Sequence, residues 1–277
     1  MAKKQAVSSR PPSREEAYFE LIAKALRGCA NYKPKFGRGR SAGVTLEQFQ
    51  QMYRADPFYN WLGLDSPRMY AAHKAAGGMT SIYRQLGIGC QWLLHQLLQD
   101  QLGLSIEQAS WEYQVPTPGK APRTLSLDGR IVLNDVQDAQ RKVRVQEWME
   151  KTFDKVLLAK EVRPKIKGAV FEVRQGYKSK DSKRQNADIS NASNAYANLY
   201  VPVLLLMSLQ IDSDVAARYT AARWLLLTGD RVGSATESTY SFCRDVLGYD
   251  LAGFFERYSA LFRAEIEAVL AALLGAK

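Results

Sequence analysis

Glu172 and Arg174 are the residues whose type and spacing first suggest chemistry. They are separated by one residue within the apolar segment Val170-Phe171-Glu172-Val173-Arg174, which the sequence predicts to be a β-strand. Alternate side chains of a strand share a face, so the acid and the guanidinium are expected on the same side. An unpaired carboxylate in a buried strand is costly, so Glu172 must be paired, lie at an exposed strand end or bind a metal ion. An ion pair with Arg174 or Lys178 is the purely structural alternative.

Two aspartates upstream could supply a second carboxylate, Asp128 and Asp135. Mg²⁺ prefers oxygen ligands and is bound by one or two carboxylates together with water and phosphate oxygens. A neighbouring cation, Arg174 or Lys178, would steady the attacking water and the developing charge. These residues predict Mg²⁺-dependent hydrolysis of a phosphodiester, with Asp135 preferred as the partner of Glu172. Structural alternatives remain for both aspartates, since Asp128 also suits a turn and Asp135 also suits a helix cap.

The strongest charge signal surrounds the same strand. Residues 160–186 contain nine Lys or Arg against three Asp or Glu, so nine minus three gives six of the formal net charge of +10. Beyond the strand, cations alternate with amides and acids, which are the side chains that read base edges in a DNA major groove. The candidate DNA-binding residues are Lys178, Lys180, Asp181, Lys183, Arg184, Gln185 and Asn186, followed by Asp188, Asn191 and Asn194 on a predicted helix. A solvated polar loop with a helix cap is the alternative.

A second basic segment, rich in glycine, contains Arg38 and Arg40 and could contact phosphates. It lacks the order of residues of a nucleotide-binding P-loop, so nucleotide binding is not expected. The excess of positive charge over the chain favours a polyanionic partner, although a generally basic protein would have the same composition.

Composition indicates a cytoplasmic protein that does not enter a membrane. No run of apolar residues approaches the ~18 needed for a membrane helix, and the basic start is not followed by an apolar run typical of a secretory signal. The three cysteines, Cys29, Cys90 and Cys243, are far apart and indicate reduced thiols rather than a disulfide or zinc site.

We expect residues 1–14 to form a flexible basic arm and residues 15–277 a single domain. Within it, residues 15–105 are predicted to be helical, residues 106–210 to form an α/β core and residues 211–277 a helical cap.

Several elements of this organisation are predicted individually. Helices are expected at 67–76 and 80–102, separated by a break at Gly77 and Gly78, and a hairpin at 124–133 with its tight turn at Asp128-Gly129. A helix is expected at 137–160, with Leu157 on its apolar face, and a last helix at 251–274. A strand at 165–175, a helix at 186–199 and an apolar strand at 201–208 predict a βαβ crossover with two parallel strands.

Three segments carry a resemblance to a known family: FEVRQGYKSKDSKRQNADISNA (171–192), GGMTSIYRQLGIG (77–89) and YVPVLLLMSLQID (200–212). In these segments the chain resembles the ApaLI-like type II restriction endonucleases, and the similarity spans most of the chain from about residue 15. The resemblance implies an α/β PD-(D/E)xK restriction-endonuclease-like core, in which helices flank a central mixed sheet. It also implies a homodimer that cleaves both strands of double-stranded DNA with Mg²⁺ at a short palindrome, GTGCAC in the family, leaving 5′-phosphates.

The family motif has an upstream Asp and then Asp or Glu, one residue and Lys on a strand. Glu172-Val173-Arg174 matches the acid but has arginine in the lysine position. Either Arg174 takes the role of the lysine, or Lys178 reaches in after the bend at Gly176. The alternative function is a non-catalytic, sequence-specific DNA-binding protein on a degenerate nuclease fold.

Overall fold

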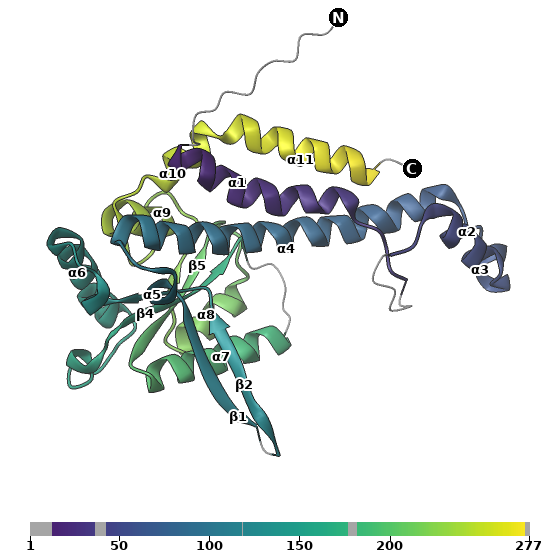
Figure 1. Ribbon diagram of the computed structural model, residues 1–277. Coiled ribbons are helices and arrows are strands. Elements are labelled where there is room, and N and C mark those ends of the chain that lie inside the picture. The colour runs from purple at the N-terminus through teal and green to yellow at the C-terminus, as the bar shows by residue number, and fades with distance from the viewer. Residues whose placement is uncertain (1–12, 37–42, 118, 177–181, 275–277) are drawn as a thin grey trace, which may run out of the picture.

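A mixed sheet of four strands lies at the centre of the protein, and helices cover both of its faces (Figure 1). The computed structural model describes residues 13–36, 43–117, 119–176 and 182–274. The strand order is β3-β4-β5-β6, with β3 antiparallel to β4 and the other neighbours parallel. The strands are β3 (Gly129–Val132), β4 (Gly168–Arg174), β5 (Tyr200–Leu206) and β6 (Leu225–Leu227). The predicted α/β class with a helix-flanked mixed sheet is confirmed.

The βαβ crossover is also confirmed. β4 leads through α7 (Ser182–Ala197) to β5, which pairs with β4 in parallel over its whole length. Every residue of β5 is buried, as expected for a parallel strand covered on both faces. α8 (Ser213–Ala221) follows β5 and leads into β6.

The side chains of β4 alternate between two apolar cores. Phe171 and Val173 belong to the larger core, which α4 and α6 complete, whereas Val170 belongs to a smaller core with residues of α7 and α8. Since strand side chains alternate, Glu172 and Arg174 lie on the face of the smaller core. The candidate active site therefore lies between the sheet and the α7–α8 layer.

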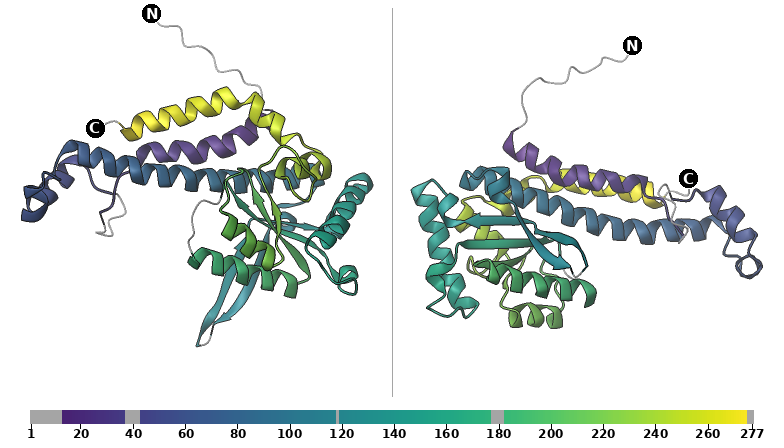
Figure 2. Two further views of the ribbon diagram at one scale, coloured as in Figure 1. Left: turned by 180° about the vertical axis from the view of Figure 1, so that it is seen from behind. Right: turned by 60° about the horizontal axis from the view of Figure 1, so that its bottom comes forward.

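Three helices pack together on the other side of the sheet, and one of them, α4, contacts β3 and β4 directly (Figures 1 and 2). They are α1 (Arg14–Arg27), α4 (Pro67–Leu102) and α11 (Ser259–Leu274). The predicted break at Gly77 and Gly78 is wrong, because α4 is one continuous helix of 36 residues. A Cβ atom on Gly77 would lie 2.0 Å from the Tyr32 hydroxyl, and one on Gly78 would lie 2.6 Å from Leu273. These glycines therefore permit close packing rather than ending a helix.

The predicted hairpin at 124–133 is wrong as well. β1 (Trp111–Thr117) and β2 (Lys120–Leu127) form a separate two-stranded ribbon, and Asp128 is the single residue between β2 and β3. The Asp-Gly sequence predicts a local turn, but β3 gains more by pairing with β4 and burying Ile131 in the larger core.

Two helix boundaries differ from expectation. α6 (Ala139–Lys155) ends earlier than predicted, so Leu157 has a φ of 54° and a largely exposed side chain instead of lying on the apolar face. The last predicted helix is divided into α10 (Leu251–Arg257) and α11.

The remaining elements are short. They are α2 (Leu46–Arg54), α3 (Pro57–Trp61), α5 (Ile106–Ala109), α9 (Thr239–Ser241), a π-helix (Phe242–Leu247) and 3-10 turns at Gly28–Asn31, Leu133–Asp135 and Arg163–Lys165. None of the helices in the described ranges has the length and apolar character required to span a bilayer.

Gly87 and Gly89 of α4 provide a test of the packing of the helical layer. A Cβ atom on Gly87 would meet nothing within 4 Å, whereas one on Gly89 would lie 2.9 Å from the Ile22 backbone of α1. Gly87→Ala should raise the free energy of unfolding by ~0.5–1 kcal/mol, through helix propensity alone. Gly89→Ala should lower it by ~1–3 kcal/mol through overpacking. Urea denaturation of both variants measures the difference, and equal effects would contradict the packing of α1 on α4.

Candidate active site

Asp128 is held against the backbone of β4. Its N–H donates to the carbonyl of Phe171 at 2.7 Å, and its carboxylate Oδ2 accepts the N–H of Val173 at 2.8 Å. Gln91 of α4 donates a further hydrogen bond to Oδ2 at 3.1 Å. Since Gly129 pairs with Phe171, Asp128 is positioned beside the β4 residues that flank Glu172. Within the described residues, both side-chain hydrogen bonds of Asp128 go to Oδ2, which leaves Oδ1 for another ligand.

Burial dominates the electrostatics of Asp128. Desolvation raises the pKa of its carboxyl to about 6, although the Val173 N–H, the charge of Arg174 and Gln91 all act to lower it. The negative charge of Asp188 adds to the rise. Strongly shifted acids of this kind are concentrated at functional sites.

Glu172 and Asp188 share one guanidinium group. Nη2 of Arg174 lies 2.9 Å from Oε1 of Glu172 and 2.7 Å from Oδ2 of Asp188. All three side chains are nearly buried, and Asp188 and Arg174 are less exposed than Glu172. The structural alternative for Glu172, an ion pair with Arg174, is therefore present. Two other carboxylates nevertheless lie in the same site.

α7 and α8 cover this site. The hydroxyl of the buried Tyr219 in α8 donates to Oδ2 of Asp188. From the ribbon, Tyr113 donates to Oδ1 of Asn191 at 2.5 Å, and burial raises the pKa of Tyr113 with a smaller contribution from the charge of Glu172. Two of the acids thus receive a side-chain hydrogen bond from a neighbouring helix, Asp188 from Tyr219 of α8 and Asp128 from Gln91 of α4.

The preference for Asp135 over Asp128 is wrong in geometric terms. Val132, three residues before Asp135, pairs with Gly168, which is about 13 Å along β4 from Glu172 at ~3.3 Å per residue. Asp135 therefore lies beyond the far end of the ladder, in the short turn after β3. Asp128 is the upstream acid that the fold brings beside Glu172.

The predicted DNA-binding residues are only partly described. Arg38, Arg40, Lys178, Lys180 and Asp181 lie outside the described residues. Residues 183–186 belong to the first turns of α7.

Base reading by Asp188 is contradicted, because its side chain is buried and faces Arg174. Asn191 is likewise engaged by Tyr113. Helical periodicity places residues 188, 192 and 195 on the sheet-facing side of α7.

Sequence reasoning missed Gln91 and Tyr219 and misassigned Asp188. A signal for Asp188 was present, since it stands at helical spacing from the buried Ala192 and Ala195. A charged residue on an apolar helix face needs a buried partner, and Arg174 is that partner. Nothing in the sequence near Gln91 indicates that it contacts Asp128.

The donor set fits a hard divalent cation better than a soft one. Asp128, directly before β3, and Glu172 on β4 offer carboxylate oxygens, the ligands that Mg²⁺ takes together with water and phosphate. Within the part of the chain that the structure describes, no group of three or more His, Cys, Asp or Glu is arranged to hold a metal. The two carboxylates suit a site that substrate oxygens and water complete.

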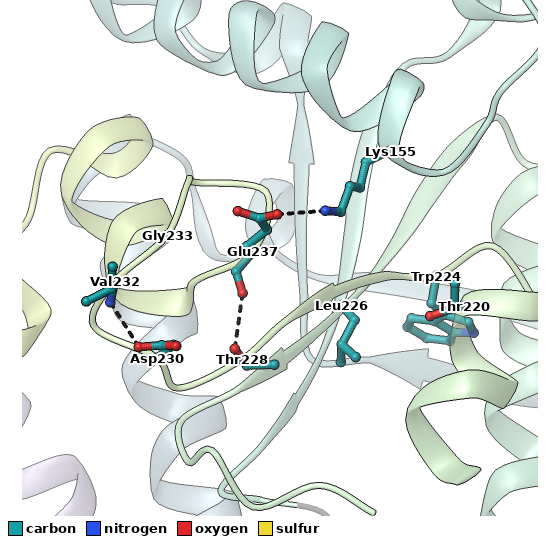
Figure 3. A pocket seen from close by; sticks show the side chains of 9 residues that line it. All are labelled: Lys155, Thr220, Trp224, Leu226, Thr228, Asp230, Val232, Gly233 and Glu237. Atoms are coloured by element: carbon teal, nitrogen blue, oxygen red, sulfur yellow. Dashed lines mark hydrogen bonds and ion pairs between the residues drawn. The ribbon is translucent and has the colours of Figure 1, made fainter. Parts of the chain in front are cut away.

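A separate cavity of about 400 Å³ opens at the β6 edge of the sheet (Figure 3). Lys155 of α6 and Glu237 form an ion pair across it at 2.7 Å, and Trp224 and Leu226 line its floor. The pair lowers the pKa of Glu237. None of the predicted site residues that the structure describes lines this cavity.

A scan against protein-family models, a search of curated proteins and a search of solved structures found no match.

Asp128→Asn should stabilise the protein at neutral pH. Its folded-state pKa of about 6 exceeds the ordinary 3.8, so its contribution to stability is full below pH 3.8 and declines as the pH rises to 6. Two pKa units correspond to at most about 3 kcal/mol. The asparagine carries no charge to desolvate and keeps an oxygen for the Val173 N–H.

The measurement is urea denaturation of both proteins between pH 4 and pH 8. The stability advantage of the variant should grow up to about pH 6 and then stay constant. Asp135→Asn is the matched control, since Asp135 lies in the short turn after β3, away from Glu172 of β4. A variant less stable than the parent at pH 8 would contradict the burial of a charged Asp128.

Proposed function

We propose that the protein is a Mg²⁺-dependent, site-specific endodeoxyribonuclease of the type II restriction class. The observation that carries the proposal is the position of Asp128 against the strand that bears Glu172-Val173-Arg174. An upstream acid beside an acid-x-cation strand is the arrangement that the resemblance to PD-(D/E)xK nucleases implies. The elevated pKa of Asp128 supports the proposal, since a carboxylate is kept in a desolvated place at a cost to stability.

Each residue has a distinct role in this proposal. Asp128 and Glu172 would hold Mg²⁺, which when bound supplies charge to stabilise the phosphorane-like transition state and lowers the pKa of water. Gln91 and the Val173 N–H fix the orientation of Asp128. Arg174 presents a permanent positive charge beside Glu172 and would stabilise the negative charge that develops on the phosphate. Lys178 remains a candidate for orienting the attacking water.

The charge of the chain supports duplex DNA as substrate. The formal charge is +10, and six of these charges come from residues 160–186, which include β4 and lead into α7. A polyanion would be drawn toward this part of the chain. A palindromic site, GTGCAC by the family expectation, would be cut by a twofold homodimer in the cytoplasm, as part of restriction-modification.

A non-catalytic DNA-binding protein is the second candidate. The observation that favours it is the ion pair between Glu172 and a buried arginine at the position where the nuclease motif has lysine. Both candidates predict DNA binding that weakens with salt, by a log–log slope of ~0.9 for each phosphate neutralised. They differ in that only the nuclease cleaves the DNA that it binds.

Incubation of the purified protein with phage DNA and Mg²⁺ tests the proposal directly. Discrete fragments with 5′-phosphates are expected, and no fragments are expected in EDTA. Glu172→Gln should lower cleavage at least ~100-fold, because a neutral amide is a poor ligand for Mg²⁺, while binding in a gel-shift assay persists.

Glu161→Gln is the matched control, since Glu161 is exposed and lies outside the site. It should cut like the parent. Tight binding with no cleavage in Mg²⁺ or Mn²⁺ would exclude the nuclease and favour the second candidate.

A further inference from the structure

We infer that Asp188 is a positioning residue that neutralises and fixes Arg174, so that Glu172 is not needed for that task and can serve as a ligand. This inference rests on the proposed nuclease function. It assigns to α7 a part in building the active site.

The contacts point to Asp188 as the more permanent of the two partners. The same nitrogen, Nη2 of Arg174, is closer to Asp188 than to Glu172, at 2.7 Å against 2.9 Å. The side chain of Asp188 is 5% exposed and that of Glu172 is 12% exposed. Solvent and ligands therefore reach Glu172 more readily than Asp188.

A buried guanidinium cannot lose its charge, because arginine stays protonated in proteins. If Glu172 were its sole carboxylate partner, any ligand that engaged Glu172 would compete with the neutralisation of Arg174. With Asp188 on the same nitrogen, the guanidinium keeps a carboxylate when Glu172 turns to a ligand. Asp188 thereby takes the structural role of neutralising Arg174, and Glu172 takes the role of a ligand.

Tyr219 supports this arrangement from α8. Its hydroxyl donates to Oδ2 of Asp188, the same oxygen that contacts Arg174, and Tyr219 is 1% exposed. A hydrogen bond from a buried hydroxyl restricts the carboxylate to one orientation. α7 and α8 together fix the position of Arg174 over β4.

The formal charges agree with a divalent ligand. Among the described residues of the site, Asp128, Glu172 and Asp188 contribute three negative charges and Arg174 one positive charge, which leaves −2 in a chain whose overall charge is +10. Without Asp188 the site would carry −1. An excess of two negative charges matches one divalent cation.

A double-mutant cycle without metal or DNA tests whether Asp188 and Glu172 both neutralise Arg174. Glu172→Gln should lower the melting temperature only slightly, since Arg174 retains Asp188. The double variant Glu172→Gln/Asp188→Asn removes both of the carboxylates described on the guanidinium. Its melting temperature should fall at least ~3 °C below the sum of the two single effects. Additive effects would overturn the inference.

Asp100→Asn is the matched control for this cycle. Asp100 accepts a hydrogen bond from the Tyr18 hydroxyl at 2.7 Å, much as Asp188 does from Tyr219, but it has no contact with Arg174. Combined with Glu172→Gln, it should show additive melting temperatures and unchanged cleavage relative to Glu172→Gln alone.

Cleavage kinetics test the positioning role. Asp188→Asn should lower kcat at least tenfold with little change in KM for duplex DNA, and Asp188→Glu should recover part of kcat. Should Asp188→Asn be unfolded, Tyr219→Phe retains every carboxylate and should still lower kcat with KM unchanged. A folded Asp188→Asn or Tyr219→Phe variant with parental kcat would overturn the inference.

The proposed nuclease function and the positioning role of Asp188 are contradicted by different results. Cleavage by the parent protein together with additive melting temperatures rejects the role of Asp188 and retains the nuclease. A coupled cycle in a parent protein that never cuts DNA rejects the nuclease and, with it, the positioning role.

Discussion

The pairing of β3 with β4 is the constraint on which the candidate active site depends. Gly129 opposite Phe171 brings the carboxylate of Asp128 to the Val173 N–H, beside the strand that bears Glu172 and Arg174. The partners are more than forty residues apart in sequence, with α6 between them. Two acids from distant segments lie together because hydrogen bonds between strands are directional and the register allows one arrangement. A shift of one residue in the register between β3 and β4 would separate the two acids.

Because the charged groups of the site are buried, each needs a hydrogen-bond partner or an opposite charge beside it. Asp128 is desolvated and its pKa is raised, and Arg174, Glu172 and Asp188 form an ionic group between the sheet and α7. Such groups contribute little net stability, since desolvation offsets the attraction. Their presence in an otherwise apolar interface is easier to explain by a function than by folding. The proposed nuclease uses the negative charge for a divalent cation and the guanidinium for a phosphate.

The helical layer on the other face contributes through its rigidity. α4 passes along the sheet, and its glycines allow α1 and α11 to pack closely on it. From this helix Gln91 donates to Asp128, so one ligand candidate is held by both the helical layer and the backbone of β4. α7 and α8 approach from the opposite side with Asp188 and Tyr219. Groups held from several elements keep their geometry better than groups on one loop.

The sequence alone predicted the βαβ crossover from local periodicity, and the family resemblance implied the mixed, helix-flanked sheet. The cost of an isolated buried charge left an ion pair with a cation as one of several alternatives for Glu172. Sequence reasoning preferred Asp135 to Asp128 as the partner of Glu172, and it placed Asp188 on the DNA-facing side of α7. An Asp-Gly pair looks the same in a tight turn and in the junction between two sheets. Which acid lies beside Glu172 depends on strand register, and which face of α7 meets Arg174 depends on the packing of that helix on the sheet. Both are contacts between distant segments, and only the tertiary structure decided them.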